Sequence, residues 1–341
     1  MRTVFALLCA GALMLPSVTL AAVGLSELPA TSASGPLTLL YPSRAEAHAL
    51  ERGGFHLLAS VDAPPDTGNG KLIAISHGSP APVWVYFDLA RALVEAGYVV
   101  VLPEHAGDNP RDGSAVGLVS WKRRPQEVSA AIDRVATDVR FARTLDFAHV
   151  GVYGMSAGGL TALSLAGGRW SPARLKAHCE RHITEDFHAC AGPAMSLDGG
   201  AFDGLKRWVV GTVLAWKLDD AQAYGGSDPR VAAAVVSVPF AAHFDPQSLR
   251  EISVPVGIIS AQRDRWLNPR YHSELVLQHC PRCSRLLDLP TGGHGALLSP
   301  LPDAAAAAGS LVADPPDFDR PHEVPRINAA IVDFFKQNLP R

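Results

Sequence analysis

The chain has 341 residues, of which 48% are hydrophobic and 18% charged, a composition typical of a folded globular protein rather than a disordered one. Its 30 Lys and Arg residues nearly balance 33 Asp and Glu residues, for a formal net charge of −3. Because no basic run stands out, the sequence carries no electrostatic sign of a nucleic-acid-binding protein.

The N-terminal 22 residues predict a secretory signal peptide. Arg2 precedes an apolar stretch at residues 4–15, Pro16 interrupts it, and small residues follow at the positions that a signal peptidase reads. We therefore expect residues 23–341 to form a periplasmic or secreted domain without a membrane span. A membrane anchor is the alternative, although the apolar stretch is short for a span.

Short apolar runs alternate with helical patterns through the first half of the mature chain, after a Pro-, Ser- and Gly-rich lead-in at residues 23–36. The predicted strands are residues 37–41, 55–61, 71–76, 98–102 and 150–153. The predicted helices are residues 83–95, closed by Gly97, residues 126–142, opened by Pro125, and a helix beginning at residues 160–165.

The alternation breaks between residues 167 and 230. This segment contains two cysteines and one apolar helical pattern, at residues 205–216, and predicts an insertion that covers the sheet as a lid. Three strands and a last helix then follow, at residues 232–238, 254–260, 285–289 and 327–338. Strands alternating with helices predict an α/β fold, with a mostly parallel sheet covered by helices on both faces.

Four cysteines remain after signal removal, an even number that predicts two disulfides in an oxidising compartment. Of three possible connectivities the simplest is local, Cys179–Cys190 and Cys280–Cys283. A metal site is the alternative for the first pair, but the spacing matches no common zinc template and surface histidines are the simpler interpretation. The histidines concerned are His178, His182 and His188.

A G-x-S-x-G sequence lies directly after a predicted strand and before a predicted helix, at residues 154–158. This setting is typical of a nucleophile elbow, in which a sharp turn lifts a serine hydroxyl above the sheet and the glycines remove side chains that would clash. The sequence therefore predicts Ser156 as a nucleophile. An ordinary Gly-rich turn is the alternative.

A serine nucleophile needs a base, and in this arrangement the acid and the histidine follow it in the chain. Asp264 comes just after the strand at residues 254–260, and His294 lies in a Gly-rich loop after the last strand. We expect Asp264 to orient His294. The alternatives are Asp245 as the acid and Asp264 as a surface residue. Two other histidines are expected on a helix surface, His272 and His279.

An oxyanion hole needs backbone N–H groups that face the developing negative charge. The N–H of Ala157, directly after the nucleophile, is one candidate. The second is the N–H of Ser79, in the sequence His77-Gly78-Ser79-Pro80 after the strand at residues 71–76. A simple turn is the alternative for this His-Gly sequence.

Taken together, these segments resemble the exported bacterial "predicted dienelactone hydrolase" branch of the α/β hydrolases, which is similar to platelet-activating-factor acetylhydrolases and polyester hydrolases. The resemblance covers nearly all of the mature chain, and dienelactone hydrolases themselves have a cysteine where this chain has Ser156. It implies a carboxylic-ester hydrolase with Ser156, Asp264 and His294 as its triad. The matching segments are HGSP, YVVVLPEHAGDN, WKRRPQEV, GMSAGG, DPRVAAAVV, ISAQRD and GGH.

The expected reaction is acyl transfer on a small-molecule or lipid-like ester, with no metal and no cofactor. An amidase or peptidase on the same triad and a non-catalytic binding protein of the same fold are the alternatives. The sequence does not indicate an oligomeric state. The aromatic residues expected at the substrate pocket are Trp84, Tyr86, Trp208 and Trp216.

Overall fold

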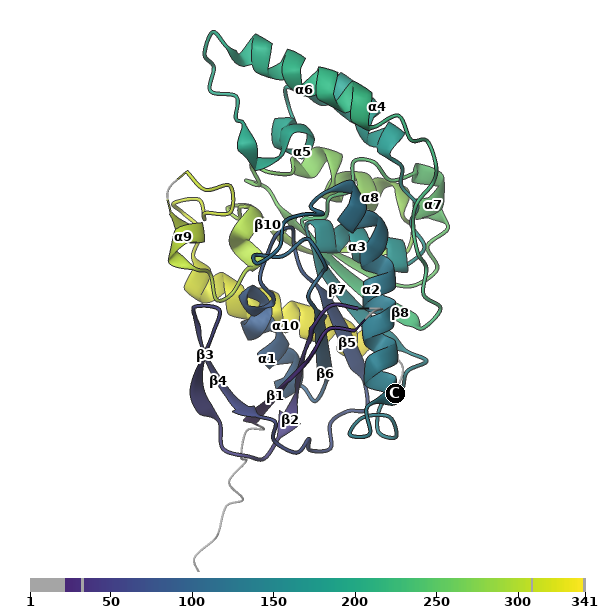
Figure 1. Ribbon diagram of the computed structural model, residues 1–341, viewed down its shortest axis with the longest axis vertical. Helices are drawn as coiled ribbons and strands as arrows, with labels where there is room; N and C mark the ends of the chain where they lie inside the picture. Colours follow the sequence, from purple (N-terminus) through teal and green to yellow (C-terminus); the bar gives the residue numbers. More distant parts are fainter. Residues whose placement is uncertain (1–21, 32–33, 308, 340–341) are drawn as a thin grey trace, which may run out of the picture.

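The computed structural model describes residues 22–31, 34–307 and 309–339 (Figure 1). The predicted signal peptide lies outside the described residues apart from Ala22. The predicted α/β architecture is confirmed: ten strands form one sheet in the order β10-β9-β8-β7-β5-β6-β2-β1-β4-β3. None of the described helices is both long and apolar enough to cross a membrane.

Six neighbouring strands of this sheet are parallel. Five of them are almost wholly buried, because helices cover both faces of the sheet, and this explains why they are continuous apolar runs in the sequence. The parallel strands are β5 (Leu72–Ser76), β6 (Val99–Pro103), β7 (Val150–Met155), β8 (Val231–Ser237), β9 (Val256–Ala261) and β10 (Cys283–Leu289).

The N-terminal strands are joined to this block through β2 (Leu37–Ser43), which pairs antiparallel with β6. β3 (His48–Arg52) and β4 (Phe55–Val61) form an antiparallel hairpin. β1 (Ala22–Leu28) lies between β2 and β4, where the sequence shows a Pro-, Ser- and Gly-rich lead-in and predicts no strand. All seven residues of β1 pair with β2, and this long-range pairing is not visible in the local sequence.

Helices cover the sheet on both faces, each over its own apolar core (Figure 1). One core contains side chains of α2 (Leu118–Thr137), α3 (Ala157–Leu165) and α8 (Ser273–His279). The other contains side chains of α1 (Phe87–Glu95) and α10 (Arg320–Asn338). The remaining short helices outside the insertion are η1 (Val83–Tyr86), α7 (Pro246–Arg250), η3 (Pro269–Tyr271), η4 (His294–Leu297) and α9 (Asp303–Ala306).

Helix α2 begins two turns earlier than the sequence predicts. Pro125 does not open it but lies inside it, and the helix ends at Thr137. A proline lacks an N–H and normally weakens a helix interior. Here the first two turns are fixed by tertiary contacts, above all those of the buried Arg124 directly before the proline.

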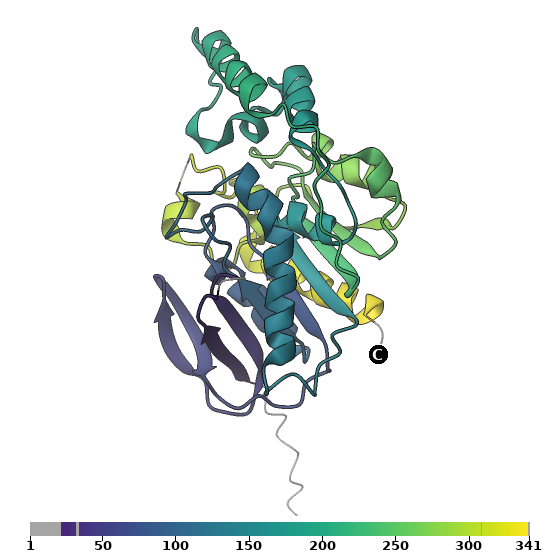
Figure 2. The same ribbon diagram turned by 45° about the vertical axis from the view of Figure 1, so that its right-hand side comes forward.

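The insertion at residues 167–230 contains more helix than the sequence predicts. The apolar pattern forms α6 (Asp203–Lys217), and three further elements precede it: α4 (Pro172–His182), α5 (Phe187–Ala191) and η2 (Gly192–Ala194). Ser171 caps α4 by accepting a hydrogen bond from the Arg174 N–H. Figures 1 and 2 show α4 and α6 side by side at one end of the molecule, beyond the carboxyl ends of the parallel strands.

Both predicted disulfides are confirmed. Cys179–Cys190 joins α4 to α5, and Cys280–Cys283 joins the end of α8 to β10. Because Cys179 and Cys190 are bonded to each other, neither offers a thiolate to a metal. Within the ranges that the structure describes, no group of three or more His, Cys, Asp or Glu side chains is placed to hold a metal ion.

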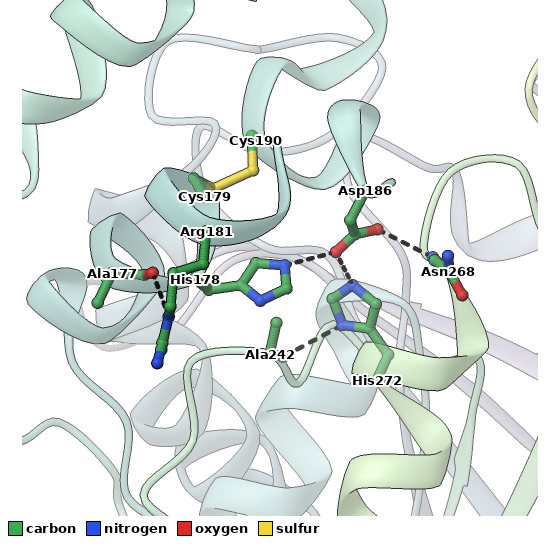
Figure 3. Close-up of a disulfide and its surroundings, with 9 residues drawn as sticks. All are labelled: Ala177, His178, Cys179, Arg181, Asp186, Cys190, Ala242, Asn268 and His272. Atoms are coloured by element: carbon green, nitrogen blue, oxygen red, sulfur yellow. Dashed lines mark hydrogen bonds and ion pairs between the residues drawn. A yellow bond between two sulfur atoms is a disulfide. The ribbon is translucent and has the colours of Figure 1, made fainter. Parts of the chain in front are cut away.

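A buried hydrogen-bond cluster beside the first disulfide joins the insertion to the start of α8 and the loop after β8 (Figure 3). Asp186 Oδ2 accepts from His178 Nε2 at 2.7 Å and from His272 Nε2 at 3.0 Å. The second ring nitrogen of His272 accepts from the N–H groups of Ala241 and Ala242. The prediction that His178 and His272 are surface residues was therefore wrong: they are 5% and 1% exposed, because each satisfies a buried partner.

Candidate active site

Ser156 lies at the tip of a sharp turn between β7 and α3. Its φ of +56° is rare for a residue other than glycine and stores backbone strain. Two hydrogen bonds hold it: the Ser156 N–H donates to the Ser237 carbonyl, and the Ser156 carbonyl accepts from the Phe240 N–H, both at 3.0 Å. The strand–turn–helix setting that the sequence predicts around Ser156 is therefore present.

Asp264 and His294 lie within hydrogen-bond distance, at 2.7 Å between Asp264 Oδ2 and His294 Nδ1. The other carboxylate oxygen accepts from the N–H groups of Trp266, at 2.8 Å, and Leu267, at 2.9 Å. Both side chains are buried. Because Nδ1–H donates its hydrogen bond to the carboxylate, Nε2 of the imidazole is left as the proton acceptor.

Ser156 and His294 line one cavity of about 220 Å³. No hydrogen bond joins Ser156 Oγ to His294 in the part of the chain that the structure describes, and in unliganded sites such bonds often tighten only when substrate binds. The cavity walls are mostly apolar, since their side chains include Pro80, Ala81, Pro82, Val85, Trp266, Leu298, Pro302, Ala305 and Val312.

The loop after β5 lies against the serine. A Cβ atom placed on Gly78 would be 3.7 Å from Ser156 Cβ, and Ser79 also lines the cavity. The Ala157 N–H is at the first turn of α3, where a helix offers it no acceptor. Over residues 22–31, 34–307 and 309–339, neither the Ala157 N–H nor the Ser79 N–H has a hydrogen-bond acceptor.

Of the four aromatic residues predicted at the pocket, the structure places only Tyr86 there. The Tyr86 hydroxyl accepts from the Gly78 N–H at 2.9 Å, and burial raises the pKa of Tyr86 to about 12. Trp84 instead lies beside the Gly53 turn of the β3–β4 hairpin. Trp208 and Trp216 are 67% and 80% exposed on α6, at the far end of the insertion (Figure 1).

The insertion contributes none of the residues that line this cavity. Part of its wall comes from Leu298, Pro302, Ala305 and Val312, at positions where the sequence predicts no pocket residue. Residues 184–188 of the insertion border a separate polar cleft of about 620 Å³, which Asp264 also lines.

The alternative acid and histidines lie elsewhere. Asp245 caps α7 by accepting from the Ser248 N–H, and it pairs with Arg174 at 2.5 Å. Asp245 is therefore engaged with groups other than a histidine. His272 takes part in the buried cluster described above, and His279 ends α8.

The structure also contains a second Ser–His–carboxylate chain, which the sequence did not indicate. Ser76 Oγ and His105 Nε2 are 2.8 Å apart, and His105 Nδ1 lies 2.6 Å from Glu127 Oε2. Burial, together with Arg124 and Arg123, holds the pKa of His105 well below its usual value. Because Ser76 has no exposed surface, a substrate carbonyl does not reach it, whereas Ser156 faces a cavity.

Comparison with protein-family models gives no match for this sequence, and comparison with curated proteins gives none either.

Proposed function

We propose that the protein is an exported serine hydrolase of the α/β-hydrolase fold that cleaves carboxylic esters through an acyl-enzyme on Ser156. The observation that carries this proposal is the Asp264–His294 hydrogen bond beside a strained elbow serine in one shared cavity. The sequence resemblance described above supports the same class of reaction.

In the proposed mechanism Ser156 Oγ attacks the ester carbonyl while His294 Nε2 accepts its proton. Asp264 keeps the imidazole in the required tautomer and stabilises the imidazolium. The C–O bond of the leaving group then breaks as His294 returns the proton to the alkoxide. Water repeats the sequence on the acyl-enzyme, releases the acid and regenerates the serine.

The developing oxyanion is stabilised by the N–H groups of Ala157 and Ser79. Ala157 directly follows Ser156 and Ser79 lines the same cavity, and their N–H groups are not engaged elsewhere in the described chain. Donors fixed before the reaction stabilise the charged intermediate without reorganisation, which makes them a large contribution to the rate.

We assign short acyl chains to the cavity. Its volume of about 220 Å³ is below the range of roughly 300–1,000 Å³ typical of sites that enclose drug-sized ligands. Its apolar walls favour a hydrocarbon chain over a charged group. A small-molecule ester, or the short acyl group of a lipid-like ester, fits these dimensions.

Export is proposed from the predicted signal peptide and supported by the two disulfides, which persist in oxidising compartments. We propose that the insertion covers the carboxyl edge of the sheet and the polar cleft beside Asp264, rather than the acyl cavity itself.

The test measures turnover of p-nitrophenyl esters and labelling by a fluorophosphonate. Wild-type protein should hydrolyse the esters and carry the label on Ser156. Ser156→Ala and His294→Ala should each lose nearly all turnover, and the double variant should lose no more, because the triad acts as a unit. A folded wild-type protein that neither turns over esters nor reacts with the probe contradicts the proposal and favours a binding protein. Faster cleavage of p-nitroanilides than of esters favours an amidase.

A further inference from the structure

A fully buried ion pair that takes no part in the proposed reaction forms hydrogen bonds with residues 77–79. Arg124 lies on α2 and Asp108 in the loop after β6, and neither side chain has exposed surface. We infer that Arg124 and Asp108 position residues 77–79, the oxyanion loop, so that the Ser79 N–H faces the carbonyl attacked by Ser156. This inference rests on the proposed function and adds positioning residues to it.

Arg124 holds two successive carbonyl groups of the loop. Its Nη1 donates to the His77 carbonyl and its Nη2 to the Gly78 carbonyl at 3.4 Å. The same guanidinium donates to Asp108 Oδ2, from Nη2 at 2.8 Å and from Nε at 3.2 Å. A planar guanidinium with several donors in fixed directions suits this task, and a lysine ammonium does not reproduce it.

The direction of the Ser79 N–H follows from the Gly78 carbonyl. The peptide between these residues is trans, so its C=O and N–H point in opposite directions. The carbonyl faces Arg124 and also accepts from His77 Nδ1 at 2.6 Å. The Ser79 N–H therefore points away from Arg124. Gly78, Ser79 and Ser156 line the same cavity, and a Cβ on Gly78 would lie 3.7 Å from Ser156 Cβ.

Asp108 binds the side chain of Ser79. Its Oδ1 accepts from Ser79 Oγ at 2.6 Å, while its Oδ2 is held by Arg124. Ser79 is thus constrained through its side chain and through the peptide that carries its N–H. Rotation of that peptide breaks the bonds to Arg124 and His77.

The histidine of the His-Gly sequence belongs to the same support. His77 Nε2 accepts from the His105 N–H at 3.1 Å, so its proton is on Nδ1, which donates to Gly78. Burial, followed by the charges nearby, holds the pKa of His77 well below its usual value. His105 is fixed in turn by Ser76 and Glu127. The Ser76–His105–Glu127 chain therefore helps to hold His77, and through it the oxyanion loop, in place.

A buried ion pair is weak evidence for stability, because the cost of removing both charges from water offsets most of their attraction. Here every partner of the Arg124 guanidinium other than Ser120 belongs to the loop or to Asp108, which binds the loop. A cation on the Gly78 carbonyl also polarises that peptide and makes its N–H a stronger donor. Positioning of the Ser79 N–H as an oxyanion donor explains why the partners of Arg124 are concentrated on this loop.

The test uses a double variant, Arg124→Gln with Asp108→Asn, so that no unpaired charge stays buried. A second variant, Ser79→Ala, removes only the hydroxyl bond to Asp108 and keeps the N–H and the ion pair. The matched control is Arg230→Gln with Asp228→Asn, an ion pair that also contacts α2, through Ser129, but lies at the start of β8.

Four quantities are measured on each variant: kcat and KM for p-nitrophenyl acetate, the inhibition constant of a trifluoromethyl ketone, and the unfolding temperature. The ketone forms a tetrahedral adduct in which Ser156 Oγ bonds to its carbonyl carbon, and its oxyanion reports on the hole. Loss of one oxyanion donor lowers kcat by about 10²–10³-fold. We expect the double variant to lose about 10²-fold in kcat and in ketone affinity, Ser79→Ala to lose about tenfold in both, and KM and the control variant to change less than twofold.

Equal ketone affinity and kcat in wild type and in Ser79→Ala, together with a folded double variant that keeps its kcat, overturn the inference while the proposed function stands. If the double variant does not fold, Ser79→Ala decides alone. A wild-type protein without esterase activity or fluorophosphonate labelling overturns the proposed function itself, and the inference with it.

Discussion

Gly154 and Gly158 meet across the turn that carries Ser156: a Cβ atom on Gly154 would lie 1.9 Å from the carbonyl oxygen of Gly158. Gly158 is equally confined, because its own Cβ would lie 1.9 Å from the Ser76 carbonyl oxygen. Backbone atoms do not yield as the end of a flexible side chain does. The glycines of the G-x-S-x-G sequence are therefore required by the close approach of the backbone, since positive φ occurs at Ser156 and at neither of them.

Replacement of either glycine by alanine should displace the elbow. We expect Gly158→Ala to lose at least 10²-fold in esterase activity and to be destabilised by about 1–3 kcal/mol, the usual effect of forcing an extra methyl group into a packed site. Urea unfolding and p-nitrophenyl acetate turnover measure the two effects. Gly211→Ala is the control, because the space around Gly211 inside α6 is open; it should gain about 0.5–1 kcal/mol. Wild-type turnover in Gly158→Ala would contradict this account of the turn.

Asp264→Asn should keep the fold and lose most of the activity. An asparagine still offers a side-chain oxygen to the N–H groups of Trp266 and Leu267, but its amide N–H₂ then faces His294 Nδ1 and favours the wrong tautomer. In a well-studied triad the same exchange lowers kcat by about 10⁴. We expect a loss of about 10³–10⁴ in kcat with an unchanged unfolding temperature. Asp245→Asn, the control, should keep wild-type kcat, and the reverse pattern would make Asp245 the acid.

The acyl-chain preference should depend on the part of the cavity wall formed by Leu298, Pro302, Ala305 and Val312, and not on α6. Val312→Ala removes two methyl groups from the cavity wall and should raise kcat/KM for hexanoate relative to acetate by about tenfold, since each added methylene in an apolar pocket is worth about 10–200-fold. Trp208→Ala and Trp216→Ala should leave the preference unchanged, because both side chains are exposed away from the cavity. A series of p-nitrophenyl esters from acetate to octanoate measures it. A shifted preference in the tryptophan variants alone would restore α6 as a specificity element.

Acidification should destabilise the protein between about pH 6.5 and 5. Burial holds the pKa values of His77, His105 and His243 well below 6.5 in the folded state, whereas in the unfolded chain they are close to 6.5. Below pH 6.5 the unfolded chain thus binds protons that the folded protein does not, so the free energy of unfolding falls as pH falls, by up to about 1.4 kcal/mol per pH unit for each histidine. Above pH 6.5 these groups contribute no slope. Urea unfolding at pH 7.5, 6.5 and 5.5 tests this.

Exposed histidines provide the control for that experiment. His322→Gln should leave the slope unchanged, since the His322 side chain is 85% exposed. A free energy of unfolding that is constant from pH 7.5 to 5.5 would show that the three buried histidines take up protons in the folded state.

Removal of the Cys179–Cys190 disulfide should lower stability without affecting the chemistry. Joining cysteines 11 positions apart limits the unfolded chain, an effect of about 3 kcal/mol for loops of this length. We expect Cys179→Ser with Cys190→Ser to unfold at a lower temperature and still to label at Ser156 with the fluorophosphonate. The Cys280–Cys283 disulfide closes a loop of separation 3, so Cys280→Ser with Cys283→Ser should have the smaller effect. Loss of labelling in the folded Cys179/Cys190 variant would place the disulfide in the active site.

The sequence was informative where local pattern decides the structure. Five of the six parallel strands are buried apolar runs. Ser156, Asp264 and His294 each follow a predicted strand, so their approach to one edge of the sheet could be predicted. β1 and the first turns of α2 depend on partners far away in the chain, and local propensity did not reveal them. The prediction that Trp208 and Trp216 line the substrate pocket was wrong, because an apolar helical pattern does not determine which part of the protein the apolar face packs against.

The contacts that Arg124 and Asp108 make with residues 77–79 were also missed, for a different reason. Arg124 and Asp108 are charged residues in a polar stretch of sequence, where a solvent-exposed position is the ordinary expectation. Nothing in the local sequence indicates that they are buried against each other. The contacts of Arg124 and Asp108 with each other and with the loop at residues 77–79 are visible only in the folded structure.

The sheet ends in only two lateral edges within the described residues, β3 on one side and β10 on the other. Both expose charged side chains, among them Glu51 on β3 and Arg285 and Asp288 on β10. Unpaired backbone groups at a sheet edge are a template on which another chain can add a strand, and charged side chains discourage it. The eight strands between them have a neighbouring strand on both sides, so their apolar segments offer no free edge to another chain. The charged edge strands therefore disfavour edge-to-edge aggregation of this wide, hydrophobic sheet.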